Sequence, residues 1–172
     1  MNPPGDAGDA VTIVRAPGGF VLTCSQWLPR PLATVFPFFA DARNLERLTP
    51  PFLKFRVLST STPGVERGTL IRYTLRLHGV PIPWTSRIDV WEPPHQFVDL
   101  QLRGPYRRWH HTHQFAAENA GTRVNDRVEF ALPFGFLHHT PVAALIQRDV
   151  QRIFAYRQDT LARHFAAEPT PV

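Results

Sequence analysis

A short stretch near the middle of the chain, GPYRRWHHTHQF (Gly104–Phe115), concentrates side chains that can do chemistry. It places three histidines among aromatic and arginine residues. Imidazole changes charge near neutral pH, so histidines serve as general bases, as hydrogen-bonding groups and as metal ligands. The stretch therefore suggests a catalytic centre, a ligand-binding wall or a metal site, and the surrounding elements must decide among them.

If this stretch is a strand, its side chains alternate between two faces. Phe115, which precedes a turn at NAGT, is the best core candidate, so its face is expected to point inward. The other members of that face are Arg107, Trp109, His111 and His113. The opposite face, expected to point outward, carries Tyr106, Arg108, His110, Thr112 and Gln114.

The same alternation selects inward residues on the neighbouring predicted strands. Asp126 shares a face with Val124, Val128 and Phe130. Asp99 and Gln101 share a face with Phe97, although Val98, Leu100 and Leu102 compete for it. Tyr73 points inward from GTLIRYTLRL, and Trp84 points inward from WTSRIDVWE together with Ser86, Ile88 and Val90. The expected ligand-contacting set is therefore Tyr73, Trp84, Asp99, Gln101, Arg107, Trp109, His111, His113 and Asp126.

The pattern along the whole chain predicts an α+β fold. A strand near Phe20–Leu28 is followed by a short helix that Pro37 interrupts and by a second short helix that Asp41 caps. Period-two patterning with turn residues then predicts six strands between Phe52 and Leu132, giving an antiparallel sheet of about seven strands. Thr140 and Pro141 begin a long helix. Its apolar stripe comprises Val142, Leu145, Ile146, Val150, Ile153, Phe154, Leu161 and Phe165.

Length and composition limit the remaining possibilities. The 172 residues suit one domain, expected at 11–168, between a disordered tail (1–10) and a flexible C-terminus (169–172). The net charge of +5 comes from scattered arginines without a basic run, so nucleic acid is not an expected partner. No signal peptide and no membrane-spanning run is present in the sequence, so we expect a cytoplasmic protein without an integral membrane segment, for which transient membrane contact stays open. His138 and His139, in the loop PFGFLHHTP, are expected to be exposed or capping.

The order of elements resembles the helix-grip arrangement of the START-like, or Bet v 1-like (SRPBCC), superfamily. Its bacterial polyketide cyclase/dehydrase-like and coenzyme Q-binding START-like branch is also similar in local stretches, among them VFPFFADARNLERLTPPFLKF, WEPPHQFVDLQLRGPYRRWHHTHQF and GTRVNDRVEFALP. The resemblance covers about Phe20 to Phe165. It implies a curved antiparallel sheet gripping a long C-terminal helix, with an internal cavity for a hydrophobic ligand. It transfers no catalytic residue to this chain.

Three functions are compatible with the polar residues on the inward faces. The first is binding of a small hydrophobic or amphipathic molecule (a lipid, quinone or polyketide-like compound) in the internal cavity. The second is a cyclase or dehydratase in which His111 or His113 is the general base, Asp126 orients it, and Arg107 or Tyr73 steadies an enolate. The third is an interaction module, for which an apolar surface patch and a filled interior are expected. Independently of these functions, His111, His113, Asp126 and Asp99 could form a buried network in which they only satisfy one another. The sequence leaves open whether the protein is an enzyme, and in what oligomeric state it occurs.

A metal site is the remaining alternative for the histidines. His111 and His113 have the spacing of two ligands on one strand face, and Asp126 or Asp99 would supply a third. This signal is weak because the third ligand is undefined and the chain has only one cysteine, Cys24, which is expected in the core. From the sequence alone we therefore expect no metal and no cofactor.

Overall fold

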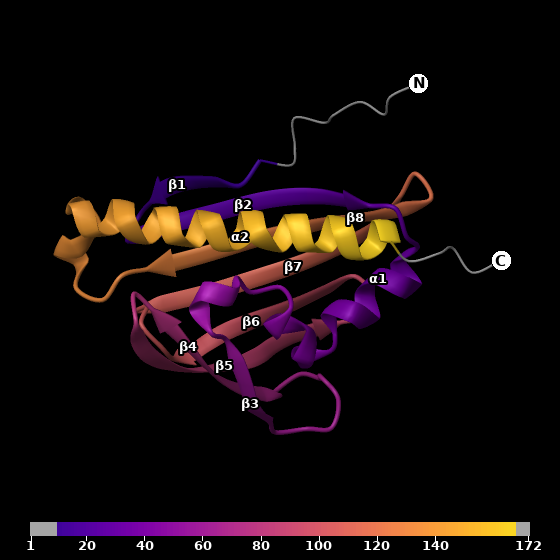
Figure 1. Cartoon of the computed structure of the whole chain (residues 1–172), viewed down its shortest axis with the longest axis horizontal. Coiled ribbons are helices and arrows are strands. Elements are labelled where there is room, and N and C mark those ends of the chain that lie inside the picture. The colour runs from indigo at the N-terminus through magenta and orange to yellow at the C-terminus, as the bar shows by residue number, and fades with distance from the viewer. Residues whose placement is uncertain (1–9, 168–172) are drawn as a thin grey trace.

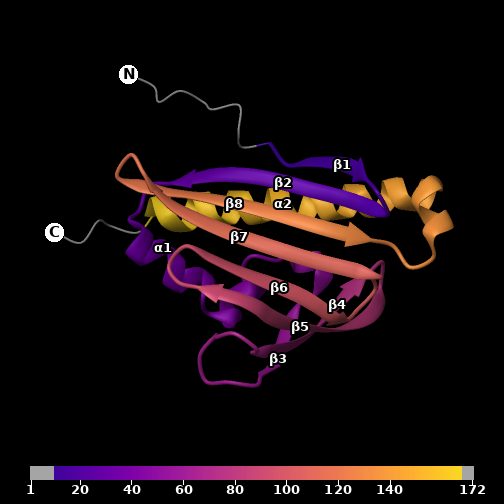
Figure 2. The ribbon, with the colours of Figure 1, turned by 180° about the vertical axis from the view of Figure 1, so that it is seen from behind.

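The computed structural model describes residues 10–167. The predicted flexible C-terminus (169–172) and all but the last residue of the predicted disordered tail lie outside this range. An antiparallel sheet of eight strands, in the order β1-β2-β8-β7-β6-β5-β4-β3, curves around the long helix α2 (Figure 1). Seen from behind, the strands lie in front of α2, so the sheet and the helix form two layers (Figure 2). The helix-grip fold is confirmed.

The elements follow the predicted order closely. The strands are β1 (Thr12–Ala16), β2 (Gly19–Leu28), β3 (Arg56–Thr60), β4 (Leu70–Leu77), β5 (Val80–Glu92), β6 (Gln96–Arg103), β7 (Arg108–Glu118) and β8 (Gly121–Ala131). The α-helices are α1 (Leu32–Phe39) and α2 (Pro141–Ala167), and the 3-10 helices are η1 (Ala42–Glu46), η2 (Pro51–Leu53) and η3 (Gly135–His139). The additional strand is β1, a short and mostly exposed edge strand that pairs with β2.

Local signals explain how the helices begin and which side they bury. Asp41 caps η1 by accepting a hydrogen bond from the Arg43 backbone N–H at 3.0 Å, as predicted, although the element is a 3-10 turn. Helix α1 includes Pro37 in its last turn and buries Val35 and Phe36 against the sheet. Helix α2 buries most of its predicted stripe, of which Val150, Phe154, Leu161 and Phe165 are almost inaccessible. In the first turns the prediction was wrong, because Val142 and Leu145 are exposed and Ala143 is buried in their place. Burial of each such side chain contributes about 1.5–3 kcal/mol.

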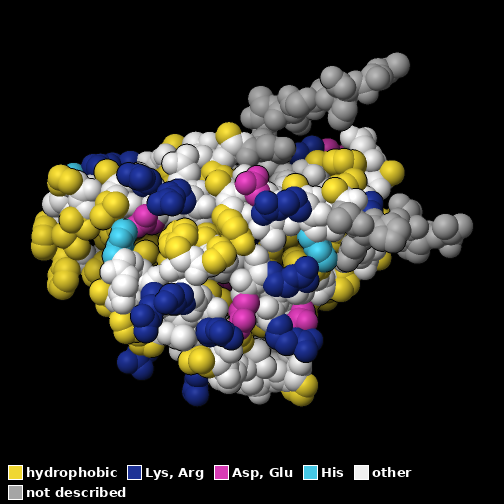
Figure 3. Space-filling view, viewed as in Figure 1, with side chains coloured by type: hydrophobic (Ala, Val, Ile, Leu, Met, Phe, Trp, Pro, Cys, Tyr) yellow, Lys and Arg dark blue, Asp and Glu magenta, His cyan; other side chains and the backbone are white. Residues whose placement is uncertain are grey.

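Two apolar clusters make up the core between α2 and the sheet. One surrounds Phe36 and Phe115 beneath α1 and the C-terminal half of α2. The other surrounds Phe20 and Phe130 beneath the N-terminal half of α2 and includes Cys24, as expected. On the face of the molecule that carries α2, lysine and arginine side chains are spread out instead of forming one patch (Figure 3). Within residues 10–167 no helix combines the length and the apolar content that crossing a bilayer requires.

One register irregularity corrects a predicted side-chain orientation. The pairing of β5 with β6 shifts between Ile88 and Val90, which inserts an extra residue into β5. Such a bulge exchanges the two faces of the strand beyond it. Val90 was predicted to point inward, but Trp91 does so instead. The centroid of its ring lies 5.5 Å from that of Phe36 and 5.8 Å from that of Phe97.

The loop before α2 contains a second correction. His138 is buried instead of exposed, and its Nε2 accepts a hydrogen bond from the Leu132 backbone N–H at 3.0 Å. Its ring packs edge-on against Phe20. His139, its neighbour, is exposed as expected. The imidazole of His138 therefore takes the place of a neighbouring strand as hydrogen-bond acceptor for the Leu132 N–H, just after the end of β8.

Candidate functional site

A cavity of about 180 Å³ lies between the curved sheet and α2. Its walls come from α1, the two 3-10 turns that follow it, strands β4 to β7 and the middle of α2. Members of both apolar clusters line it, for example Phe97 from one and Phe154 from the other. The cavity is therefore the space that the curved sheet and the helix leave between the two parts of the core.

The predicted inward face of β7 is confirmed along the strand itself. Trp109, His111 and His113 line the cavity, and Phe115 is in the core. The two histidines are only 5% and 3% exposed. Antiparallel pairing sets Asp99 of β6 opposite His111, and Asp126 of β8 opposite His113. The strand register thus brings the two predicted acidic residues to either side of the histidine pair.

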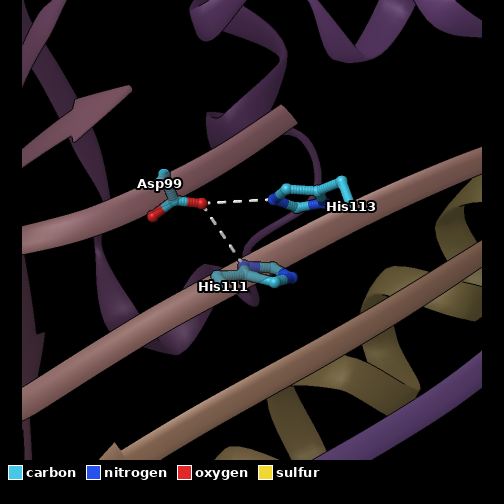
Figure 4. Close-up of side chains that lie close together, drawn as sticks. All are labelled: Asp99, His111 and His113. Carbon is cyan, nitrogen blue, oxygen red and sulfur yellow. Dashed lines mark hydrogen bonds and ion pairs between the residues drawn. The ribbon is translucent and has the colours of Figure 1, made fainter. Parts of the chain in front are cut away.

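Each imidazole lies between two carboxylates. Asp99 Oδ2 is 3.2 Å from His113 Nε2 and 3.5 Å from His111 Nδ1, as Figure 4 shows. On the other side, Asp126 Oδ1 is 3.0 Å from His111 Nε2 and 2.7 Å from His113 Nδ1. Asp99 lines the cavity, whereas Asp126 is buried behind the rings, so the acids differ in their access to a ligand.

Arg157 of α2 belongs to this site, although the sequence analysis did not select it. Its guanidinium lines the cavity, is almost fully buried, and lies 3.3 Å from His113 Nδ1 and 3.6 Å from Asp126 Oδ1. The same group stands over the rings of Phe39 and Phe154. Its position in the sequence, between Phe154 and Leu161 of the apolar stripe, is the signal that could have revealed it.

Ser86 of β5 continues the polar contacts from Asp99 to Tyr73 of β4. Its Oγ lies 3.1 Å from the Tyr73 hydroxyl, accepts a hydrogen bond from Trp84 Nε1 at 3.1 Å, and donates to Asp99 Oδ1 at 3.4 Å. Trp84 stacks on Tyr73 and meets Trp109 edge-on. A connected series of polar groups therefore runs from β4 across the sheet to α2, framed by aromatic rings.

Two predicted members of the site lie elsewhere. The Gln101 side chain closes the turn after β6: its Nε2 donates to the Tyr106 carbonyl at 2.6 Å, and its Oε1 accepts from the Tyr106 N–H. Arg107 is exposed and donates to the Gly18 carbonyl at 3.3 Å. Tyr106, predicted to point outward, lines the cavity instead. The reason is that β7 begins at Arg108, so strand alternation does not apply to the turn before it.

Comparisons with known proteins agree with this architecture. Residues 28–157 match the family described as polyketide cyclase / dehydrase and lipid transport. The chain belongs to this family. No curated protein matches the sequence significantly.

Among solved structures, this member of the polyketide cyclase/dehydrase and lipid transport family is similar to an aromatase/cyclase from a Streptomyces strain, with 18% identity and a TM-score of 0.67 over 85% of this chain and 93% of that one. The ginseng major latex-like protein 151 from Panax ginseng gives 8% identity and a TM-score of 0.62 over 84% of this chain and 96% of that one. A nucleoside-diphosphate sugar epimerase from Corynebacterium glutamicum is 27% identical, with a TM-score of 0.58, over 83% of this chain but 28% of its own. The first two likenesses show the shared fold.

Burial and charge set the protonation of the site in this family member. Burial lowers the pKa of His111 to about 4, assisted by the neighbouring His113 and opposed by the two carboxylates. Burial alone would raise the pKa of Asp126, but the charge of Arg157 and the contacts of both imidazoles hold it well below its usual value. The pKa of Asp99 is also lowered, since the His113 hydrogen bond and the nearby positive groups outweigh its burial. Both carboxylates are therefore ionised at neutral pH.

Burial also raises the pKa of Tyr73 well above its ordinary value, with the charge of Asp99 adding to the effect. Its hydroxyl is therefore a neutral hydrogen-bonding group at the cavity wall.

Three side chains could in addition hold a metal: Asp99, His111 and His113 offer donor atoms that lie within 4.8 Å of one another.

Proposed function

We propose that the protein binds a compact amphipathic molecule in the cavity beneath α2. The observation that carries the proposal is the composition of the cavity wall, which is apolar and aromatic except for one connected polar series. Ligand pockets combine many apolar contacts with a few placed polar groups in this way. The apolar body of the ligand would lie against Trp84, Trp109 and Phe154, and its polar group would meet Asp99 and Arg157.

The polar groups are positioned before any ligand arrives. Asp99 is held by Ser86 and His113, and Arg157 by its contacts with His113 and Asp126. A site that is already ordered loses less side-chain entropy on binding, which favours affinity. The family to which the chain belongs covers cyclases, dehydrases and lipid transport, and this range supports a hydrophobic ligand.

The size of the cavity narrows the ligand class. Its volume of about 180 Å³ is smaller than the roughly 300–1,000 Å³ of pockets for drug-sized ligands. A quinone head group or a polyketide-like ring system therefore suits the cavity better than a long acyl chain or a sterol.

The test is a thermal-shift and calorimetric screen of the full chain with quinones, aromatic polyketides, fatty acids and sterols. A ligand at 100 times its Kd stabilises the folded state by about 2.7 kcal/mol, which for a domain of this size raises Tm by at least about 5 °C. We expect ring compounds to give this shift. The proposal fails if no compound in the panel shifts Tm or gives a binding isotherm.

A pair of variants ties the binding to the cavity. Leu75 lines the cavity, and Leu75→Trp fills part of it, so the Tm shift should disappear. Arg76 is the next residue on β4 and is exposed, so Arg76→Trp adds the same side chain outside the cavity and should keep the shift. If both variants bind equally well, the ligand lies elsewhere.

An enzymatic role is the second candidate, favoured by the contacts of Asp126 with both imidazoles. A histidine oriented by a carboxylate beside a ligand pocket is the arrangement used to remove a proton next to a carbonyl, the step on which cyclisation and dehydration depend. Incubation with aromatic polyketide analogues and product analysis test it. A His111→Ala/His113→Ala double variant should abolish turnover; full turnover in that variant, or no product from the natural sequence, excludes it.

A further inference from the structure

Three donor atoms from adjacent strands converge on the cavity wall (Figure 4). Asp99 Oδ2 lies 3.5 Å from His111 Nδ1 and 3.2 Å from His113 Nε2. Ligands bound to zinc at about 2.0–2.2 Å with tetrahedral angles are separated from one another by about 3.3–3.6 Å. These two separations are close to those that a shared metal ion requires, and all three atoms lie within 4.8 Å of one another.

The remaining nitrogen of each imidazole faces the same carboxylate. His111 Nε2 and His113 Nδ1 lie 3.0 Å and 2.7 Å from Asp126 Oδ1, behind the cavity wall. Histidines that bind metals nearly always donate their second N–H to a carboxylate, a carbonyl or water, which fixes the ring and its tautomer. Ser86 holds Asp99 in the corresponding way through Oδ1, leaving Oδ2 for the histidines. All three donor atoms are thus oriented by a second set of contacts.

The hydrogen atoms available leave one of these contacts unsatisfied. Arg157 can only donate, so its contact with His113 Nδ1 places the hydrogen of that neutral ring on Nε2, which donates to Asp99. His111 donates from Nε2 to Asp126, so its Nδ1 presents a lone pair to Asp99 Oδ2, which also only accepts. A cation among the three atoms would replace this repulsive contact by shared coordination, with the His113 hydrogen then on Nδ1 beside Asp126.

The formal charges of the site are compatible with a bound cation. Asp99 and Asp126 contribute two negative charges and Arg157 one positive charge, so neutral histidines leave one uncompensated negative charge at a buried site. Uncompensated buried charge is unfavourable. A divalent cation would reverse the sign and leave one positive charge, which suits an anionic oxygen arriving from the cavity.

We propose that Asp99, His111 and His113 bind a divalent first-row metal ion of the zinc type. Two imidazoles and one carboxylate form the ligand set of open zinc and non-haem iron sites, in which further positions remain for water or substrate. Here those positions face the cavity, since all three ligands line it. This inference does not depend on the proposed function. If the protein binds the metal but no amphipathic molecule, the metal site stands and the proposed function fails.

The test is direct metal titration of the full chain, freed of any affinity tag and treated with a chelator. Zn²⁺ binding is followed by calorimetry, and Co²⁺ binding by its visible absorption. We expect one ion per chain, with a Kd in the micromolar range or below, and a Co²⁺ spectrum of low coordination number. Asp99→Asn should weaken Zn²⁺ binding at least 100-fold, and Asp126→Asn, which alters the orienting group and also removes the carboxylate beside Arg157, about 10- to 100-fold.

His110→Gln is the matched control, because His110 is the neighbouring histidine of β7 on the opposite face of the strand. It should bind Zn²⁺ as the natural sequence does. The proposal is overturned if the natural sequence binds neither ion at stoichiometric level, or if Asp99→Asn binds as tightly as the natural sequence, which would place the ion elsewhere. Should Asp99→Asn not fold, the Co²⁺-shifted proton resonances of the natural protein decide: shifts on the rings of His111 and His113 support the site, and shifts confined to other histidines refute it.

Discussion

Replacing Arg157 by methionine tests whether α2 is tied electrostatically to the sheet. The guanidinium lies 3.6 Å from Asp126 Oδ1, and both side chains are more than nine-tenths buried. At an effective dielectric constant of about 20, two unit charges at this separation attract by about 4.6 kcal/mol. Methionine keeps most of the apolar stem but leaves the Asp126 carboxylate without its guanidinium.

The expected cost is about 3–5 kcal/mol, the range found when one partner of a buried ion pair is removed. Urea unfolding followed by circular dichroism measures it. Arg148→Met is the control: Arg148 is exposed on the same helix, and its replacement should change the free energy of unfolding by less than about 0.5 kcal/mol.

A double variant separates the ion pair from lost packing. In Asp126→Asn/Arg157→Met no uncompensated carboxylate remains, so its destabilisation should be smaller than the sum of the two single variants by about 1–3 kcal/mol. If Arg157→Met lowers the free energy of unfolding by less than about 1 kcal/mol, or if the costs of the two single variants simply add, Arg157 and Asp126 do not form a stabilising ion pair.

Two further predictions concern the periphery of the site. Burial lowers the pKa of His138 in the folded chain. When the pH is below the ordinary histidine pKa of about 6.5, the unfolded chain therefore binds more protons than the folded chain. The free energy of unfolding should then fall as the pH drops through about 6.5. His138→Gln keeps an acceptor for the Leu132 N–H and should flatten this slope in urea titrations across pH; an unchanged slope would contradict the assignment. Gly121→Ala should destabilise by about 1–3 kcal/mol, since its Cβ would lie 2.4 Å from the Leu28 carbonyl oxygen. Gly64→Ala, with nothing within 4 Å of its Cβ, is the control, and equal stability losses would refute the steric argument.

Local patterns were sufficient to predict the fold and most of β7. Alternation anchored on Phe115 correctly placed Trp109, His111 and His113 inward, because β7 and β8 pair without a register shift. The same rule failed at Tyr106 and Arg107, which precede the strand, and at Val90, where a bulge intervenes. Alternation is reliable inside a regular ladder and says nothing where the ladder starts or shifts.

The composition of the site required three-dimensional contacts. Arg157 is 44 residues from His113 in the sequence, and only the placement of α2 across the sheet brings them together. The choice between Asp99 and Asp126 as the cavity-facing acid was likewise undefined in the sequence, since both alternate inward. Strand pairing assigns them different positions, with Asp99 at the wall and Asp126 behind the rings. The sequence analysis considered these side chains as metal ligands and expected no metal, and the close approach of Asp99 to both histidines, on which the proposed metal site rests, is visible only in the structure.

Binding in the cavity can be observed by native mass spectrometry of the tag-free chain after gentle extraction. We expect a complex with a small molecule of ring type, either co-purified or formed with a compound of the panel. The mass difference should disappear in Leu75→Trp and persist in Arg76→Trp. A chain that stays unliganded with every compound, or a complex that Leu75→Trp leaves intact, would contradict binding in the cavity.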